Sequence, residues 1–206
     1  LFGIGDALAY GRFMQQSPST ITIDNVNSTG SFKVSGYDLN GNKVDQLSII
    51  KNTNHDGFGV GGVASGDDAE LGFKGGKSET IAVEFNTAVK TFDVQFAWRN
   101  NTEKAKVEFF DAAGKSVGWA IISGGGSDKL ALVTYYDAAG KETKRVEVSG
   151  GSDRVDLAYT FEPGGGMAFT KAIFSAVGDN DDYLIHSISY KEVVDGTATS
   201  ISGAAE

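Results

Sequence analysis

Apolar and polar residues alternate in short runs along most of this chain. The clearest run contains Phe92, Val94, Phe96 and Trp98, with one smaller or polar residue between each pair. Because successive side chains of a β-strand point to opposite faces, this spacing places all four on one face, toward a core. The same alternation predicts further strands at 81–85, 130–136, 183–193, 20–24, 43–51 and 168–176.

Turn signals separate these runs, and one of them is repeated. Val107 to Lys115 ends in Phe-Asp-Ala-Ala-Gly-Lys, and Val133 to Lys141 ends in Tyr-Asp-Ala-Ala-Gly-Lys, 26 residues later. In each copy an aromatic strand end is followed by an aspartate that caps a turn and a glycine that takes positive φ. Further turn signals are Asn40-Gly41 and Gly75-Gly76, and Asp38 is predicted to cap the first of them.

Helical signals are few. Asp6 to Gln16 has some helical character, which Gly11 weakens. Short strands about ten residues apart, with turns between them, are typical of a sandwich or jelly roll. We therefore predict an all-β fold, a two-sheet antiparallel β-sandwich or jelly-roll-like domain over residues 1–194. Residues 195–206 are small and polar and are predicted to begin a linker to another domain.

Composition narrows the range of functions. The chain has 206 residues, no cysteine and a net charge of -9. The charge disfavours nucleic acid as a partner, and the lack of cysteine removes thiolate catalysis and thiolate metal sites. No apolar run is long enough to span a bilayer, so membrane insertion is not expected. Neither His55 nor His186 belongs to a zinc or triad pattern, and no carboxylate pair stands out, so we predict a binding protein and not an enzyme.

Two acidic clusters are candidate calcium sites. One contains Asp179, Asp181 and Asp182, followed by Tyr183 at the start of the last predicted strand; the other contains Asp67, Asp68 and Glu70 after a glycine-rich run. Calcium takes six to eight oxygen ligands, and both clusters supply several within a few residues. The alternatives are a solvated acidic turn for the first cluster and a flexible loop for the second.

Candidate ligand-binding residues follow the strand that ends at Trp98. Trp98 is expected to complete the inward stripe, after which Arg99, Asn100 and Asn101 enter a loop. An arginine can hold a carboxylate with two hydrogen bonds, so an anionic ligand group could bind here, although a solvated loop without a ligand is the favoured interpretation. Asn180 and Tyr183 complete the set of predicted ligand-binding residues.

Several of these stretches together resemble the ligand-binding domains of giant RTX adhesins from Gram-negative marine bacteria, especially the peptide-binding ones. The resemblance extends over roughly residues 55–193. The stretches that carry it are Gly57 to Gly62, Asp67 to Leu71, Glu79 to Phe85, Phe92 to Trp98, Glu103, Phe110 to Lys115, Asp181 to Ile185 and Ile188 to Tyr190.

The resemblance implies a calcium-stabilised cell-adhesion module. It implies type I secretion, an extracellular position at the cell surface, and attachment through short peptides with free C-termini on other cells. Calcium would be held by Asp67, Asp68, Glu70, Asp179, Asp181 and Asp182. Two alternatives remain open, a calcium-dependent lectin-like module for glycans and a calcium-rigidified extender without a ligand. A monomeric module is expected, since many tethered copies already supply multivalency.

Overall fold

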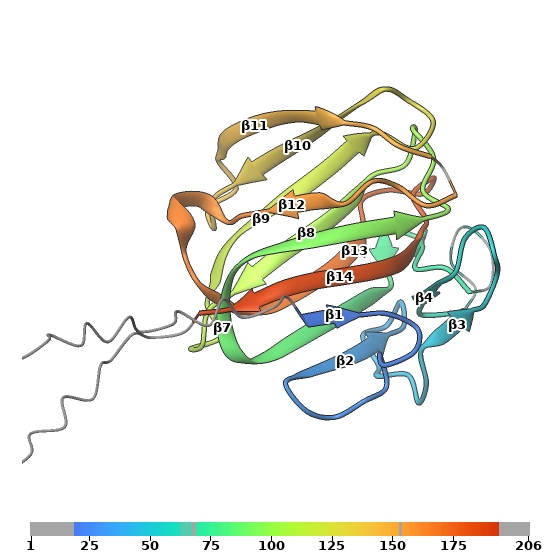
Figure 1. The fold of residues 1–206 in the computed structure, drawn as a ribbon, viewed down its shortest axis with the longest axis horizontal. Helices are drawn as coiled ribbons and strands as arrows, with labels where there is room; N and C mark the ends of the chain where they lie inside the picture. The colour runs from blue at the N-terminus through green and yellow to red at the C-terminus, as the bar shows by residue number, and fades with distance from the viewer. Residues whose placement is uncertain (1–18, 63, 65, 67–68, 153, 194–206) are drawn as a thin grey trace, which may run out of the picture.

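The fold is almost entirely β-structure and is described by a computed structural model over residues 19–62, 64, 66, 69–152 and 154–193 (Figure 1). All strand pairs within the described residues are antiparallel, and a single 3-10 turn, η1 at Gly164–Gly166, is the one helical element there. The predicted all-β sandwich is confirmed. The strands are β1 Ser19–Ile21, β2 Phe32–Tyr37, β3 Ser48–Ile50, β4 Gly57–Gly59, β5 Phe73–Lys74, β6 Lys77–Ser78, β7 Thr80–Ala97, β8 Ala105–Phe110, β9 Ser116–Gly124, β10 Leu130–Tyr136, β11 Glu142–Ser149, β12 Tyr159–Phe161, β13 Phe169–Ala176 and β14 Leu184–Glu192.

One long strand, β7, joins the two layers. Its first half pairs with β2 and β13, whereas its second half, from Phe92 onward, pairs with β12 and β14. The stretches 81–85 and 92–98, predicted as two strands, therefore belong mainly to one strand of 18 residues. Because each half of β7 has different neighbours, the strand passes from one layer of the sandwich into the other.

The two layers follow from these pairings. One layer runs β11-β10-β9-β8-β13 and continues through the first half of β7 to β2. The other contains β12, the second half of β7 and β14, and the free side of β14 is shared by β1 and by β4 with β3. In Figure 1 the second layer lies in front of the first.

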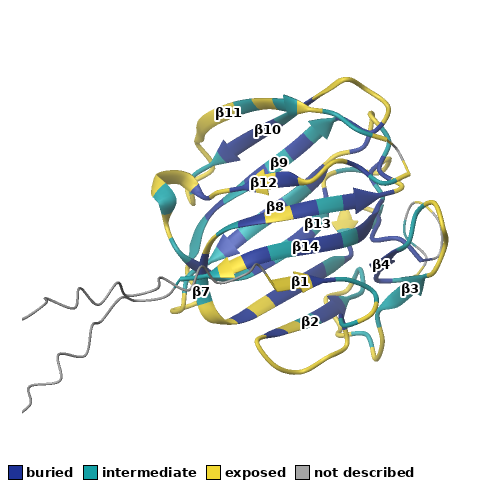
Figure 2. Ribbon diagram, in the orientation of Figure 1, coloured by how far each residue is buried: buried dark blue, intermediate teal, exposed yellow. Residues whose placement is uncertain are grey.

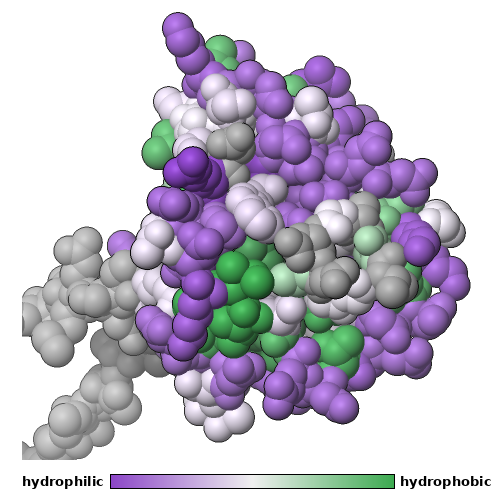
Figure 3. Space-filling view, turned by 90° about the vertical axis from the view of Figure 1, so that its right-hand side faces the viewer, coloured by the Kyte–Doolittle hydropathy of each residue, from purple (hydrophilic) through white to green (hydrophobic). Residues whose placement is uncertain are grey.

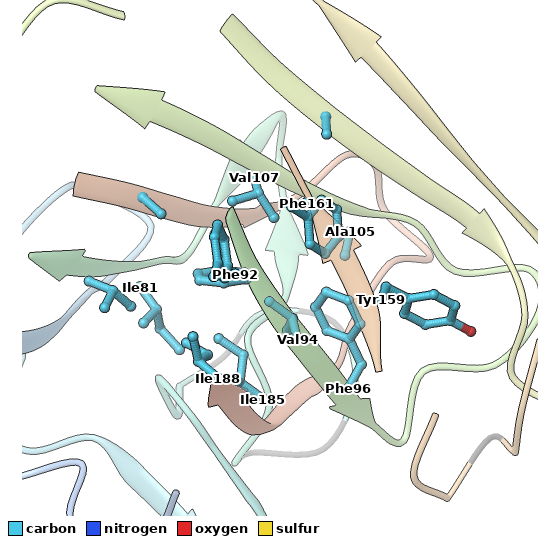
Figure 4. Packing of buried hydrophobic residues seen from close by; sticks show 14 of the residues in the cluster. Ile81, Phe92, Val94, Phe96, Ala105, Val107, Tyr159, Phe161, Ile185 and Ile188 are labelled. Atoms are coloured by element: carbon cyan, nitrogen blue, oxygen red, sulfur yellow. The ribbon is translucent and has the colours of Figure 1, made fainter. Parts of the chain in front are cut away.

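Aromatic rings fill the space between the layers. Phe92, 1 % exposed, stands at the point where β7 changes layers, and four other phenylalanine rings surround it. Its ring centroid lies between 5.4 and 6.1 Å from those of Phe109, Phe161, Phe169 and Phe174. Figure 2 shows burial along the middle of both layers, and Figure 4 shows Phe92 and Phe161 among the packed side chains. The alternation in the sequence thus corresponds to side chains that meet between two sheets.

The repeated hairpins have the predicted turn chemistry. Oδ1 of Asp111 accepts hydrogen bonds from the backbone N–H groups of Ala113 and Lys115, at 3.0 and 2.9 Å. Asp137 makes the same two bonds in the second copy, and Asp38 accepts an equivalent pair from the N–H groups of Asn40 and Asn42. The interpretation of these aspartates as turn caps is confirmed.

Other predictions had mixed outcomes. The strand at 130–136 has the predicted bounds, and His186 is half-buried on β14. Of the predicted strand at 43–51, only Ser48–Ile50 forms β3. The helical signal at Asp6 to Gln16 and the proposed linker at 195–206 lie outside the described residues.

The prediction that Trp98 belongs to the core is wrong. β7 ends at Ala97, and Trp98 takes a φ of 53°, the only positive φ of a non-glycine residue within the described residues. This change of backbone direction interrupts the alternation, so the indole is 36 % exposed and does not face the interior.

The central position of Phe92 gives a test of the packing. Replacing Phe92 by alanine should lower the free energy of unfolding by about 3–5 kcal/mol, because the cavity lies between two sheets that cannot close on it. Urea denaturation would measure the change. Phe110→Ala is the matched control, since Phe110 is only partly buried on β8, and it should cost about 1 kcal/mol or less. Equal costs for the two variants would contradict the packing described above.

Candidate functional site

The candidate site lies where loops gather at the end of the sandwich that is on the right in Figure 1. The loop from 98 to 104 follows β7, and the loop from 177 to 183 precedes β14. A third loop, from 60 to 72, reaches the same place, since Leu71 pairs with Tyr183 through two backbone hydrogen bonds of 2.9 and 3.1 Å. Figure 3 views this end and shows a largely hydrophilic surface with an apolar area near the middle and smaller apolar areas elsewhere.

Asp181 joins two of these loops. It is 6 % exposed, and its Oδ1 accepts a hydrogen bond of 2.9 Å from the backbone N–H of Lys104. Its Oδ2 accepts hydrogen bonds from the N–H groups of Val177 and Gly178, at 3.1 and 2.8 Å. Three backbone donors therefore surround this carboxylate, and it anchors the loops whether or not an ion is bound.

Three further carboxyl groups lie close together: those of Glu70 and Asp182 meet beside Gly66, and that of Glu103 contacts Asp182. A Cβ atom at Gly66 would lie 2.6 Å from Oε2 of Glu70 and 2.6 Å from Cγ of Asp182, so only glycine allows this approach. Glu103 is 6 % exposed and exchanges a hydrogen bond with Asp182. We call Glu70, Glu103 and Asp182 the acidic cluster.

The electrostatics of the acidic cluster favour a proton or a cation. Burial raises the pKa of Glu103 to about 8, while a hydrogen bond from the N–H of Asn100 opposes the shift. The negative charges of Asp182 and Glu70 raise the pKa further. A carboxyl group with this environment resists becoming a third adjacent anion, and a bound cation would remove that resistance.

The structure brings some predicted metal ligands together and leaves others apart. Glu70 and Asp182 are in the acidic cluster, whereas Asp179 is exposed on the turn after β13. Asp67 and Asp68 lie outside the described residues; Gly66 and Ala69, which flank them, are described. Within the described part of the chain, no three aspartate, glutamate or histidine side chains are arranged as a metal cage. Glu103 was not among the predicted ligands, because no neighbouring acid in the sequence marks it.

Arg99 is directed toward the interior and is fully buried. Its Nε and Nη2 donate hydrogen bonds of 3.1 and 2.8 Å to Oδ2 of Asp156, and its Nη1 donates one of 2.8 Å to the carbonyl of Glu103. The guanidinium carbon also lies 5.7 Å from the ring centroid of Phe96 and 5.8 Å from that of Tyr159. Arg99 is enclosed and three of its N–H groups already bond to the protein, so its role as a ligand clamp stays a prediction.

Asp156 completes a buried network around Arg99. Its Oδ1 accepts hydrogen bonds from the N–H of Gly126, at 2.8 Å, and from the hydroxyl of Tyr159, at 3.1 Å. Burial raises the pKa of Asp156, and the charge of Arg99 opposes that shift. Gly125 also touches the network, since a Cβ there would lie 2.4 Å from the Tyr159 hydroxyl and 2.8 Å from Nη2 of Arg99. The glycine run after β9 therefore allows the backbone to approach the ion pair.

The other predicted ligand-binding residues differ in exposure. Tyr183 is fully buried, and its hydroxyl donates to the carbonyl of Ser175 at 2.8 Å, so it belongs to the core. Oδ1 of Asn100 accepts hydrogen bonds from the N–H and hydroxyl of Thr102. Asn101 and Asn180 are exposed, and Nδ2 of Asn101 donates to Asp128 at 3.0 Å. Asn101 and Asn180 alone of this set present their side chains mainly to solvent.

Comparison of the chain with protein-family models, with curated proteins and with solved structures finds no match. Within the described residues there is no helix long and apolar enough to cross a membrane. The chemistry of the site must therefore be argued from its own geometry.

The buried ion pair should contribute far more to stability than a surface pair. Asp156→Ala removes one partner and leaves the Arg99 charge enclosed, so it should lower the free energy of unfolding by about 3–5 kcal/mol. Glu142→Ala breaks the exposed pair with Arg145 on β11 and should leave the free energy of unfolding almost unchanged, because solvent screens this pair. Chemical denaturation of both variants would measure the difference. Similar losses would show that the buried pair is not the stronger anchor.

Glu103 should make stability depend on pH when no metal is present. The folded protein keeps the Glu103 proton up to about pH 8, whereas the unfolded chain releases it near 4.5. The stabilisation is therefore complete below the unfolded pKa and is lost as pH rises through the folded pKa. In chelator, the free energy of unfolding should fall by roughly 2–4 kcal/mol between pH 5 and pH 8.

The matched variants are Glu103→Gln and Glu84→Gln. The first removes the titrating group and should flatten most of this pH dependence, while the second changes an exposed residue of β7 and should keep it. Stability that rises between pH 5 and pH 8 in the unmodified protein would contradict the assignment.

Proposed function

We propose that this domain is a calcium-dependent binding module and not an enzyme. The observation that carries the proposal is the acidic cluster, in which a buried glutamate lies beside two further carboxyl groups at one end of the sandwich. A fold that collects negative charge in this way favours either a proton or a cation at the cluster. At neutral pH and in millimolar calcium, the cation is the better partner.

The donor chemistry supports calcium over other metals. Every side chain of the acidic cluster offers oxygen, and the chain has no cysteine to attract softer metals. Asp67 and Asp68, directly after Gly66 in the sequence, would add carboxylates, and loop carbonyls would complete the six to eight oxygens that calcium requires. Asp179 and Asp181 are proposed to take part in or support the same site.

For the ligand, we propose a short peptide with a free C-terminal carboxylate on the surface of another cell. A calcium ion would supply the positive charge that this acidic domain otherwise lacks, and a peptide carboxylate would be attracted to it. Asn101 and Asn180 are exposed at the same end, and their amide groups are proposed to bind the peptide backbone. The resemblance to RTX adhesin domains supports this ligand class and an extracellular, cell-surface location.

Calcium should stabilise the fold measurably. Free calcium at about 100 times its dissociation constant would add about 2.7 kcal/mol, which raises the melting temperature of a chain of this size by about 5–10 °C. Glu103→Gln and Asp182→Asn should reduce the shift. Asp137→Asn, in a hairpin turn remote from the acidic cluster, should leave the shift unchanged even if it lowers the starting temperature. Superimposable melting curves in calcium and in chelator would exclude the calcium site.

The ligand is tested by competition in the same calcium buffer. Peptides with a free C-terminus should bind in calcium and fail to bind in chelator, and their C-terminal amides should bind at least about tenfold more weakly. Binding of simple sugars in place of peptides would favour the lectin-like alternative. Calcium stabilisation without any ligand would favour a structural extender.

A further inference from the structure

Both histidines of the chain hold the same loop. Residues 51–56 connect β3 to β4, and the imidazole of His55 stacks on Trp98 with ring centroids 3.9 Å apart and an interplanar angle of 9°. On the other side, Nδ1 of His186 on β14 lies 2.8 Å from the carbonyl of Asp56 and 3.0 Å from its Oδ1. The chain contains only these two histidines, so both of its imidazole groups lie at this loop.

The loop has few other attachments. β4 has three residues and pairs with β14 through Ile185 and Phe58 alone, and Asn52, Thr53 and Asn54 are exposed. Four loop residues, Lys51, Asn52, Thr53 and Asp56, form most of the wall of a surface cavity of about 360 Å³ that Ile23 and Asp24 complete. The shape of this cavity therefore depends on how firmly the two histidine contacts hold the loop.

The contact between Trp98 and His55 requires an unfavourable backbone conformation at Trp98. Its φ of 53° is unfavourable for a residue with a Cβ, yet this backbone geometry brings the exposed indole against His55. The strain is a separate observation from the His186–Asp56 contact. Two separate contacts therefore hold this loop: the stack of His55 on Trp98 at the end of β7, and the contact of Asp56 with His186 on β14.

Protonation of the two histidines strengthens both contacts of the loop. A protonated His186 forms an ion pair with the Asp56 carboxylate, whose Oδ1 lies 3.0 Å from Nδ1, beside the hydrogen bond to the Asp56 carbonyl. A protonated His55 converts the aromatic stack on Trp98 into a cation–π contact. Asp56 is the charged group that contacts His186. Asp24 and Lys51 line the neighbouring cavity together with Asp56, Arg154 accepts from the Trp98 N–H through its backbone carbonyl, and β4 has no charged residue. Because Oδ1 of Asp56 lies 3.0 Å from Nδ1 of His186, added positive charge on His186 is favoured there.

We propose that His55 and His186 form a proton-sensitive clasp that holds the loop 51–56, and the cavity beside it, more tightly in mildly acidic solution than at neutral pH. The clasp uses no residue of the acidic cluster. It therefore operates whether or not the domain binds calcium.

Amide hydrogen exchange of the intact protein tests the clasp. The amides of residues 52–56 should be about fivefold better protected at pH 5.5 than at pH 7.5, after correction for the intrinsic exchange rates. Amides of β10, which lies in the other layer, serve as the internal reference for global opening. Equal loop protection at the two pH values, or weaker protection at pH 5.5, would overturn the proposal.

Two variants separate the effect of histidine protonation from ordinary packing of the same side chains. His55→Phe keeps an aromatic ring on Trp98 without a titrating charge, and His186→Gln keeps a hydrogen-bond donor toward Asp56. Each should lose part of the pH response, and the double variant should show the same loop protection at both pH values. A double variant that retained the full response would assign it to other groups and would also overturn the proposal.

Discussion

The buried ion pair between Arg99 and Asp156 organises the end of the sandwich where the candidate site lies. At 2.8 Å and with both side chains almost fully enclosed, it joins the exit of β7 to the segment before β12. Further hydrogen bonds link Arg99 to the Glu103 carbonyl and Asp156 to the Gly126 N–H and the Tyr159 hydroxyl. A buried pair of this kind is costly to break, because the remaining charge would be buried without a partner or water. The pair therefore holds the loops in one arrangement.

This arrangement explains how an acidic end is possible in a chain that is already negatively charged. The Arg99 network anchors the backbone of Glu103, and Asp181 anchors Lys104 and the turn after β13 through three N–H groups. These contacts hold the loops in place while Glu70, Glu103 and Asp182 approach one another. The repulsion within the acidic cluster is thus offset by neighbouring interactions, while burial and the negative charges of Asp182 and Glu70 raise the pKa of Glu103.

The aromatic core and the site are connected through β7. The strand carries Phe92 and Phe96 between the layers and then delivers Trp98 to the surface and Arg99 to the interior within two residues. The positive φ at Trp98 makes this possible, because it reverses the expected order of inward and outward side chains. The same backbone feature places the indole against His55, so the loop between β3 and β4 is attached to the strand that organises the core.

The sequence by itself determined the β class, most strand positions and the chemistry of the repeated turns. Alternation and the Asp-Ala-Ala-Gly-Lys turns are local signals, and the bonds made by Asp111 and Asp137 lie within five residues. Only the tertiary structure decided that β7 belongs to both layers, that Trp98 is exposed, that Arg99 pairs with Asp156 57 residues away, and that Glu103 joins Glu70 and Asp182. These features depend on long-range packing and on a single backbone angle. No pattern of neighbouring residues specifies which distant charge will become buried beside which.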